Sequence, residues 1–276
     1  MNDRVQKLRE QSVETRPYIS TERAELITEF YKSDIPLRVS CAVCRALAFK
    51  HLMGKKTVCI NEGELIVGVR GPAPRSTPTY PELCCHSLED LRVINSRERT
   101  TFVVTDQVRD IYEKKIIPFW SGKSIREKLF ATVSDTWHRA FEAGVFTEFM
   151  EQRAPGHAIL DDKIYHQGLL DFKQAISESR KKLDYLNDPD AYNKDQQLLA
   201  MDICADALVT FAQRYAQKAR DLARNESDPI RRNELEQIAD ICMHVPAHPP
   251  RNFHEALQMY WFMHLGVITE LNTWDS

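Results

Sequence analysis

The segment from Asn252 to Ser276 constrains the fold more than any other part of the chain. It reads NFHEALQMYWFMHLGVITELNTWDS, and residues 253–268 are apolar on nearly every face of a helix. Asn252 and Glu255 have the N-x-x-E spacing of a capping box, which predicts that the helix begins there. A helix that is apolar all round is covered on several sides in a soluble protein. We therefore expect a central core helix, and a chain that is a portion of a larger protein.

Apolar residues at three- and four-residue spacing predict helices in most of the remaining chain. Each of the last two long helices before residue 252 is expected to begin at an Asp-Pro pair, in which the aspartate caps the helix and the proline takes the first helical position. The expected helices cover residues 22–32, 36–51, 106–118, 124–131, 135–143 and 165–185, and two more start at Asp188-Pro189 and Asp228-Pro229.

One stretch has the pattern of strands. Thr57–Ile60 and Leu65–Val69 alternate or are β-branched, and the turn-forming residues 61–63 separate them, so a small hairpin is predicted. The expected fold class is therefore mainly α with a small β hairpin. A possible domain sub-boundary lies near Asn187, where a turn precedes the long helices.

Composition argues against several classes of protein. The 276 residues are 43% hydrophobic and 28% charged with a net charge of −3, and the basic residues are scattered, so nucleic acid is not an expected partner. No apolar run reaches the roughly 18–20 residues of a membrane span. The N-terminus, MNDRVQKLREQS, is polar and lacks the apolar region of a signal peptide. We expect a cytoplasmic protein that does not enter a membrane.

The seven cysteines are expected to be reduced, since no secretion signal is seen. Cys41 and Cys44 form a CxxC pair, but no second pair follows at zinc-site spacing, and the surrounding run LRVSCAVCRALAF is apolar and helical. We interpret both as core residues rather than redox or metal ligands.

The histidine pairs and loop motifs do not predict a metal or nucleotide site. His244 and His248 are four residues apart, but Pro246 lies between them, so the helical spacing of a metal pair fails. His254 and Glu255 begin an HExxH motif that Gln258 breaks. The phosphate-binding glycine motifs GxxxxGK[ST] and GxGxxG are absent. No metal-binding or cofactor-binding residue is therefore predicted in this chain.

His157 lies in an unusual loop between helical segments. The block FTEFMEQRAPGHAILDD, residues 146–162, sets ionisable groups against an apolar surface, and Pro155-Gly156 fixes a turn just before the imidazole. A rigid turn could present His157 as a proton-transfer group or a ligand contact. A buried structural histidine explains the same residues.

Four segments resemble the N-terminal part of the glycyl radical enzymes of the pyruvate formate-lyase superfamily. They are EFMEQRAPGH (148–157), PTYPELCCHSLEDL (78–91), INEGELIVG (60–68) and MYWFMHLGVITELNTWD (259–275). The first and last are most similar to the hydroxyproline branch. The similarity covers essentially all of the chain, which would form roughly the first third of a protein of the family's usual length.

The resemblance implies a fold and an activity. The chain would be the N-terminal helical part of an α/β barrel, and all of 1–276 would belong to one pyruvate formate-lyase-like domain. The parent enzyme would be a radical lyase that eliminates water from trans-4-hydroxy-L-proline. It would carry a protein glycyl radical, installed by a separate activating enzyme that uses S-adenosylmethionine and an iron–sulfur cluster. A homodimer is possible in this family. The cysteine and glycine loops that the chemistry requires are expected in later segments, so this chain alone is expected to be inactive.

The resemblance also gives roles to two residues. His157 falls where the family places a histidine beside the departing hydroxyl, and is the expected catalytic acid. Asp275 falls where the family places a carboxylate on the substrate amino group; without the resemblance, Asp275 is interpreted as a helix cap. Three alternatives stay open: another glycyl radical eliminase (a diol dehydratase, or a C–N or C–S lyase), a formate C-acetyltransferase, and a non-catalytic helical interaction module.

Overall fold

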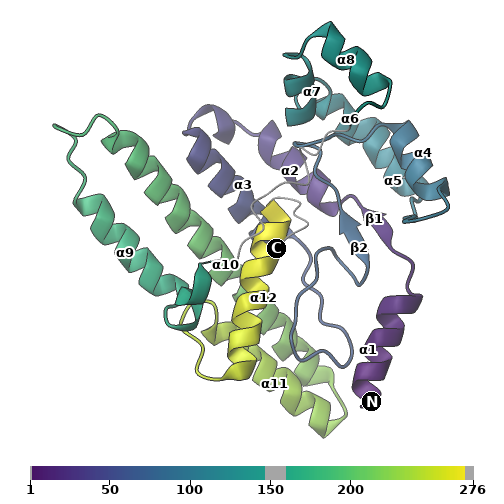
Figure 1. Cartoon of the computed structure of the whole chain (residues 1–276). Helices are drawn as coiled ribbons and strands as arrows, with labels where there is room; N and C mark the ends of the chain where they lie inside the picture. Colours follow the sequence, from purple (N-terminus) through teal and green to yellow (C-terminus); the bar gives the residue numbers. More distant parts are fainter. Residues whose placement is uncertain (1, 147–159, 271–276) are drawn as a thin grey trace.

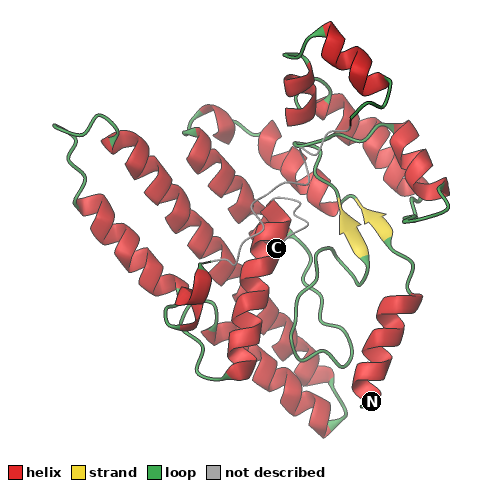
Figure 2. Cartoon of the chain, in the orientation of Figure 1, coloured by secondary structure: helices red, strands yellow, loops and turns green. Residues whose placement is uncertain are grey.

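The computed structural model describes residues 2–146 and 160–270, and within these ranges the chain is mainly helical (Figures 1 and 2). The α-helices are α1 (Asp3–Glu14), α2 (Glu22–Lys32), α3 (Cys41–Lys55), α4 (Leu88–Ser96), α5 (Asp106–Ile111), α6 (Ile117–Trp120), α7 (Ile125–Phe130), α8 (Asp135–Glu142), α9 (Leu169–Lys181), α10 (Ala191–Asn225), α11 (Pro229–His244) and α12 (Phe253–Glu270). Short helices η1 (Ile35–Leu37), η2 (Tyr112–Ile116, a π-helix) and η3 (Asp161–Tyr165) and strands β1 (Tyr18–Ser20) and β2 (Ser76–Pro78) complete the described part. The predicted mainly α fold class is confirmed, and the predicted small β hairpin is replaced by a two-stranded parallel sheet.

The core is built around α10, the longest described helix. Leu208, Phe211, Tyr215 and Ala219 recur along one face and are buried, as their spacing predicts. Seven further alanines of α10 are buried as well, and such small side chains let neighbouring helices approach closely. Helices α3, α9 and α11 pack against α10, and Figure 1 shows α9 along the first part of α10 and α11 beside its end.

Helix α12 lies in this core, as predicted, but only one side of it is fully covered. Met259, Phe262 and Leu265 are completely buried against the other helices. The opposite side shows Phe253, Leu257 and Tyr260, which are 78%, 41% and 40% exposed. These three residues are spaced as neighbours along one helical face, so the described part of the molecule leaves an apolar stripe open on α12.

The predicted start of α12 is confirmed, although the capping box is not reciprocal. Asn252 Oδ1 accepts a hydrogen bond from the Glu255 backbone N–H at 3.0 Å. The Glu255 carboxylate instead accepts from the backbone N–H of Arg251, at 2.7 Å, and also pairs with the Arg251 guanidinium. The helix start is therefore held by residues 251, 252 and 255 together.

The small β element lies elsewhere than predicted and is not a hairpin. Strands β1 and β2 pair in parallel, with Tyr18 opposite Ser76 and Ser20 opposite Pro78, and Tyr18 forms one further parallel bridge to Val103. The Thr57–Val69 stretch forms no strand. Parallel strands need a crossover connection rather than a tight turn, and α2 and α3 supply it here.

Side chains of α12 explain why the Thr57–Val69 stretch is extended without pairing. The buried Gln258 amide accepts from the Val67 N–H at 2.8 Å and donates to the Val67 carbonyl at 2.9 Å. The Trp261 indole N–H donates to the Gly68 carbonyl at 2.9 Å. The Gln258 side chain thus supplies the donor and the acceptor that a neighbouring strand would offer. The backbone of this β-like stretch is therefore hydrogen-bonded by side chains of α12 and not by another strand.

The two Asp-Pro pairs behave differently. Asp228 caps α11 through a hydrogen bond from the Ile230 N–H at 3.0 Å, and Pro229 is the first helical residue, as predicted. The prediction for Asp188-Pro189 was wrong, because α10 begins later, at Ala191. There Asp188 accepts from the Asp190 N–H at 3.0 Å and pairs with Lys194, so its carboxylate closes a turn before the helix.

The cysteine interpretation holds for one member of the CxxC pair and is wrong for the other. Cys44 is buried in the core between α2 and α3, whereas Cys41 is exposed at the start of α3. The cysteine-bearing helix begins at Cys41, capped by Ser40, and not at Pro36, which lies in η1. All seven cysteines are free thiols.

Candidate functional site

Both site residues predicted from the sequence lie outside the described residues. His157 falls in 147–159 and Asp275 in 271–276. In the sequence, the described residue nearest to Asp275 is Glu270, the last residue given for α12, five positions earlier. The candidate site can therefore be built up from this helix end.

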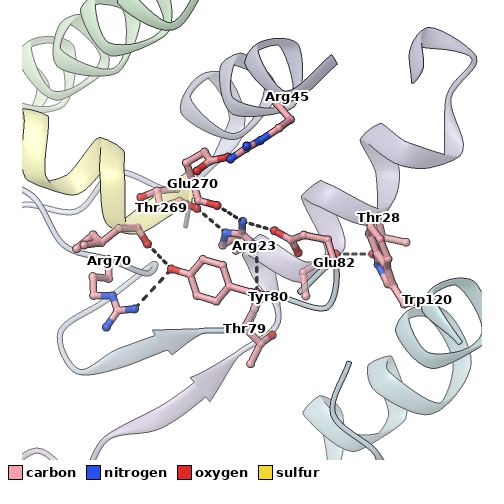
Figure 3. Close-up of polar contacts among 12 residues, drawn as sticks. Arg23, Thr28, Arg45, Arg70, Thr79, Tyr80, Glu82, Trp120, Thr269 and Glu270 are labelled. Atoms are coloured by element: carbon pink, nitrogen blue, oxygen red, sulfur yellow. Dashed lines mark hydrogen bonds and ion pairs between the residues drawn. The ribbon is translucent and has the colours of Figure 1, made fainter. Parts of the chain in front are cut away.

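The last carbonyls of α12 are held by side chains from the N-terminal part of the chain (Figure 3). Arg23 Nε donates to the Thr269 carbonyl at 2.6 Å, and Arg23 Nη2 donates to the Glu270 carbonyl at 3.1 Å. The Tyr80 hydroxyl donates to the Ile268 carbonyl. We call Arg23, Tyr80 and Glu82 the α12 clamp.

The Arg23 guanidinium is buried, yet its charge is compensated. Glu82 forms an ion pair with Arg23 Nη2, and the Tyr80 ring lies under the guanidinium at 3.8 Å. Burial by itself lowers the pKa of Arg23, but the attraction and hydrogen bond of Glu82 outweigh this effect, and the net shift of the pKa is upward. Arg23 therefore stays charged, and its positive charge lies where the helix dipole of α12 is negative.

The Thr79–Glu82 segment that carries half of the clamp is itself fixed. Pro78 ends β2 and Pro81 restricts the backbone between the two clamp residues. The buried Tyr112 hydroxyl donates to Thr79 Oγ1 at 2.6 Å, and the Ile125 N–H donates to the Glu82 carbonyl at 2.9 Å. The clamp is thus attached to η2 and α7 as well as to the small sheet.

An exposed ion pair supports the same helix end from the opposite side. Arg45 of α3 contacts one carboxylate oxygen of Glu270 through Nη2 at 2.5 Å and Nε at 3.2 Å. The side chains are 59% and 32% exposed, so solvent screens this pair and its contribution to stability is small.

Sequence reasoning did not predict Arg23 or Glu82, although one signal was present. Arg23, Ile27 and Phe30 share one helical face of α2, and Ile27 and Phe30 are core residues. A charge at a core position of a helix needs a buried partner. The position of that partner, 59 residues later, could not be read from the spacing.

The histidines considered as metal ligands make other contacts. The His244 and His248 rings stack with centroids 5.2 Å apart, and His244 Nε2 lies 2.9 Å from the Pro249 carbonyl. His254 Nε2 lies 2.8 Å from the Leu65 carbonyl. Within residues 2–146 and 160–270 there is no group of three or more His, Cys, Asp or Glu side chains that could hold a metal ion.

Comparison with known proteins places the whole chain in one family. The profile of the pyruvate formate lyase-like family matches residues 1–276. The chain belongs to this family. The clamp residues Tyr80 and Glu82 lie in one of the four segments that resemble the superfamily, and α12 lies largely in another. Among the described residues, this family member has no helix long and apolar enough to cross a membrane.

One curated relative and two solved structures show which members of the family the chain is similar to. It is 50% identical to trans-4-hydroxy-L-proline dehydratase of Clostridioides difficile over 99% of this chain and 35% of the relative. The crystal structure of that organism's hydroxyproline dehydratase, with trans-4-hydroxy-L-proline bound, matches with a TM-score of 0.93 over 99% of this chain and 34% of that one. The glycerol-bound B12-independent glycerol dehydratase of Clostridium butyricum matches with a TM-score of 0.90 at 29% identity, covering 99% of this chain and 34% of that one. The chain thus spans about a third of the length of these pyruvate formate lyase-like relatives.

Proposed function

We propose that this chain forms the substrate-binding N-terminal portion of a glycyl radical dehydratase that acts on trans-4-hydroxy-L-proline. One observation carries the proposal. Half of the residues are identical, over nearly the whole chain, to an enzyme whose crystal structure holds this substrate. Identity to the glycerol dehydratase is lower, at 29%. The cytoplasm, where a reduced set of thiols is maintained, is the proposed location.

His157 is the proposed general acid. Hydroxide is a poor leaving group, and an imidazolium beside the hydroxyl can protonate it as the C–O bond breaks. Asp275 is the proposed partner of the substrate ammonium. A carboxylate and an ammonium stabilise each other in a pocket of low dielectric when both are fully paired.

The radical chemistry is proposed to come from outside these two residues. A protein glycyl radical would supply hydrogen-atom abstraction from the substrate, and a separate activating enzyme with S-adenosylmethionine and an iron–sulfur cluster would install it. Cys44 and Cys242 are buried in the helical core, and no radical role is assigned to any cysteine of this chain. This chain's residues bind the substrate, orient it and deliver the proton.

A chimera tests the proposal. Residues 1–276 replace the matching part of the C. difficile hydroxyproline dehydratase, and the product is activated under anaerobic conditions with that enzyme's own activating partner. We expect dehydration of hydroxyproline, and little turnover of glycerol or isethionate. An activated chimera that prefers glycerol or isethionate would assign the chain to another eliminase. A normal radical signal without any turnover would support the non-catalytic module.

Two variants of the chimera test the residue roles. His157→Gln should lower kcat by roughly 10²–10⁴-fold. Asp275→Asn should raise KM for hydroxyproline by the equivalent of roughly 2–4 kcal/mol, the usual effect of removing one partner of a buried charge pair. His166→Gln and Asp240→Asn, at exposed described positions, are the matched controls. If the controls and the site variants behave alike, the two roles are wrong.

A further inference from the structure

The two thiols of the CxxC pair on α3 have different surroundings. Cys41 is the first residue of the helix and is exposed, whereas Cys44, one turn later, is buried. Residues three positions apart in a helix are neighbours on one face. An exposed thiol beside a buried one is the arrangement that redox-active cysteines have, because the exposed thiol reacts first and the buried thiol resolves the product.

Positive groups lie near Cys41. Ser40 caps α3 by accepting a hydrogen bond from the Val43 N–H, so the positive end of the helix dipole lies at Cys41. The Arg45 guanidinium, one turn further along α3, interacts electrostatically with Cys41 as well as with Glu270. Such groups attract the thiolate, which is the form of cysteine that attacks a disulfide.

Cys44 has the properties of a resolving thiol. Burial and the neighbouring Cys41 raise the pKa of Cys44, so Cys44 stays protonated while Cys41 reacts. A hydrogen bond from the Tyr31 hydroxyl of α2 acts in the opposite direction on this pKa. Tyr31 is itself held in place, since its ring packs edge-on against Trp120 with the centroids 5.5 Å apart. A donor is therefore in position to stabilise the Cys44 thiolate when it forms.

The first turn of α3 can bring the two sulfur atoms together. Cβ atoms three residues apart on a helix are roughly 5–6 Å from each other, and a disulfide needs roughly 3.5–4.5 Å, so the turn has to tighten. At its start the turn is attached to Ser40 by two hydrogen bonds, from the Cys44 N–H to the Ser40 carbonyl at 2.8 Å and from the Val43 N–H to Ser40 Oγ at 3.4 Å. The second of these is long and therefore weak, so a small shift of the turn costs little.

We propose that Cys41 and Cys44 form a thiol–disulfide exchange site that reacts with small disulfides. The Cys41 thiolate attacks one sulfur of a disulfide RSSR, which forms a mixed disulfide and releases a thiolate that takes up a proton. Cys44 then loses its proton to solvent and attacks Cys41 Sγ, so that the Cys41–Cys44 bond forms and the second thiolate leaves. The protein dithiol is oxidised and RSSR is reduced to two RSH. This site is independent of the proposed dehydratase function.

Oxidised glutathione is the probe that tests the proposal. The reduced 276-residue chain is incubated with it in the absence of oxygen at about pH 8, and samples are acidified, alkylated and analysed by peptide mass spectrometry. We expect a transient glutathione adduct on Cys41, followed by a Cys41–Cys44 disulfide, with the helical circular dichroism retained. In Cys44→Ser the adduct on Cys41 should persist, because the resolving thiol is gone. In Cys41→Ser, Cys44 should not react.

Cys204 provides a matched control, because it lines the same cleft as Cys41 and burial raises its pKa to about 11. Cys204→Ser should react as the wild type does. Tyr31→Phe, which keeps the ring and removes the hydroxyl, should slow the closing step about tenfold, the equivalent of one hydrogen bond to a charged group.

Four results would overturn the exchange site. They are the absence of any reaction at Cys41, a glutathione adduct on Cys41 that persists in the wild type, a Cys41–Cys204 bond in place of the Cys41–Cys44 bond, and a disulfide that forms only after the helical circular dichroism has been lost.

Discussion

Lys56 makes the stability of the fold depend on pH. Its side chain is buried at 3% exposure and donates to the Val69 and Arg70 carbonyls at 3.2 and 3.1 Å. Burial, offset in part by Glu22, lowers the pKa of Lys56 to about 8. An unfolded lysine has a pKa of about 10.4. Between these values the unfolded chain holds a proton that the folded chain has released, so stability rises with pH across this window and is penalised below pH 8.

Lys56→Met should remove this contribution. Between pH 7.5 and 9.5 the wild-type free energy of unfolding should increase by roughly 2 kcal/mol relative to the variant, as linkage requires. Urea unfolding at the two pH values measures the difference. Lys50→Met, at an exposed position of α3, is the control and should leave the pH dependence unchanged. Equal slopes for wild type and Lys56→Met would contradict the assignment.

The cysteines should react with alkylating reagents in an order set by burial. Cys41 is exposed, whereas burial raises the pKa of Cys204 to about 11 and also raises the pKa of the completely buried Cys242. Since the thiolate is the reactive form, iodoacetamide at pH 8 should modify Cys41 first and Cys242 only after unfolding. Peptide mass spectrometry over time gives the order. Cys41→Ser should abolish the fast phase, and a fast phase that persists would show another accessible thiol.

At the scale of elements, Gly168 lies where two backbone segments pass very close to each other. The Leu169 and Leu170 N–H groups, at the start of α9, donate to the Pro246 and Ala247 carbonyls at 2.8 and 3.1 Å. A Cβ on Gly168 would lie 2.2 Å from the Ala247 oxygen, which is closer than any real contact. The start of α9 is thereby attached to the segment between α11 and α12.

Gly168→Ala should therefore lower the free energy of unfolding by roughly 1–3 kcal/mol, the usual cost of overpacking. Gly54→Ala is the matched control, because Gly54 lies inside α3 and no atom of another described segment lies within 4 Å of the position that a Cβ would take there. Alanine is favoured there by roughly 0.5–1 kcal/mol, so Gly54→Ala should stabilise the protein. Chemical denaturation measures the free energy of unfolding of both variants. Changes of the same sign in the two variants would contradict the prediction.

Local signals predicted the helices well and the strands poorly. The 22–32 helix, the Asp228 cap and the apolar face of α10 depend on residues close together in the chain, so their patterns are visible in the sequence. The strand prediction was wrong because Gln258, almost two hundred residues later, forms the hydrogen bonds to the Val67 backbone N–H and carbonyl that a neighbouring strand would form. Asp188 does not cap α10, because its carboxylate accepts hydrogen bonds from the Asp190 backbone N–H and from the Lys194 ammonium instead.

At the scale of the whole molecule, the C-terminal half of α12 lines an apolar cleft. The cleft has a volume of about 710 Å³ and is lined mainly by apolar side chains of α3, α10 and α12, among them Phe49, Met201 and Met263. The described part of the chain thus has two apolar surfaces on α12, this cleft and the stripe of Phe253, Leu257 and Tyr260. Such areas mark surfaces that bind other apolar groups.

The 276-residue chain should accordingly bind a hydrophobic dye and self-associate at high concentration. Leu257→Gln should reduce dye fluorescence and shift gel filtration towards the monomer. Leu186→Gln is the matched control, since Leu186 is 94% exposed but lies on the turn between α9 and α10 and not on α12. A chain that binds no dye and stays monomeric would contradict the expectation, as would an equal effect of the two variants.

The candidate site could be predicted only in part from the sequence, because the residues that build it are far apart in the chain. His157 was singled out by the Pro155-Gly156 turn before it, but the roles of His157 and Asp275 come from the resemblance of local segments to a family and stay proposals. The clamp joins residues 23, 80, 82 and 268–270, so no local window of the sequence contains it. Only the core-facing position of Arg23 on α2 pointed to it.

The parallel pairing of β1 has a consequence for how the chain is made. A ribosome releases β1 long before its partners at Ser76–Pro78 and Val103. At the roughly 5–20 residues per second of translation, the strand waits for several seconds with its backbone groups bonded to water. Helices α2 and α3, which follow it directly and pack on each other, can form in that interval. The first stable unit on a nascent chain should thus be this helix pair, with the sheet closing over it only after Val103 has emerged.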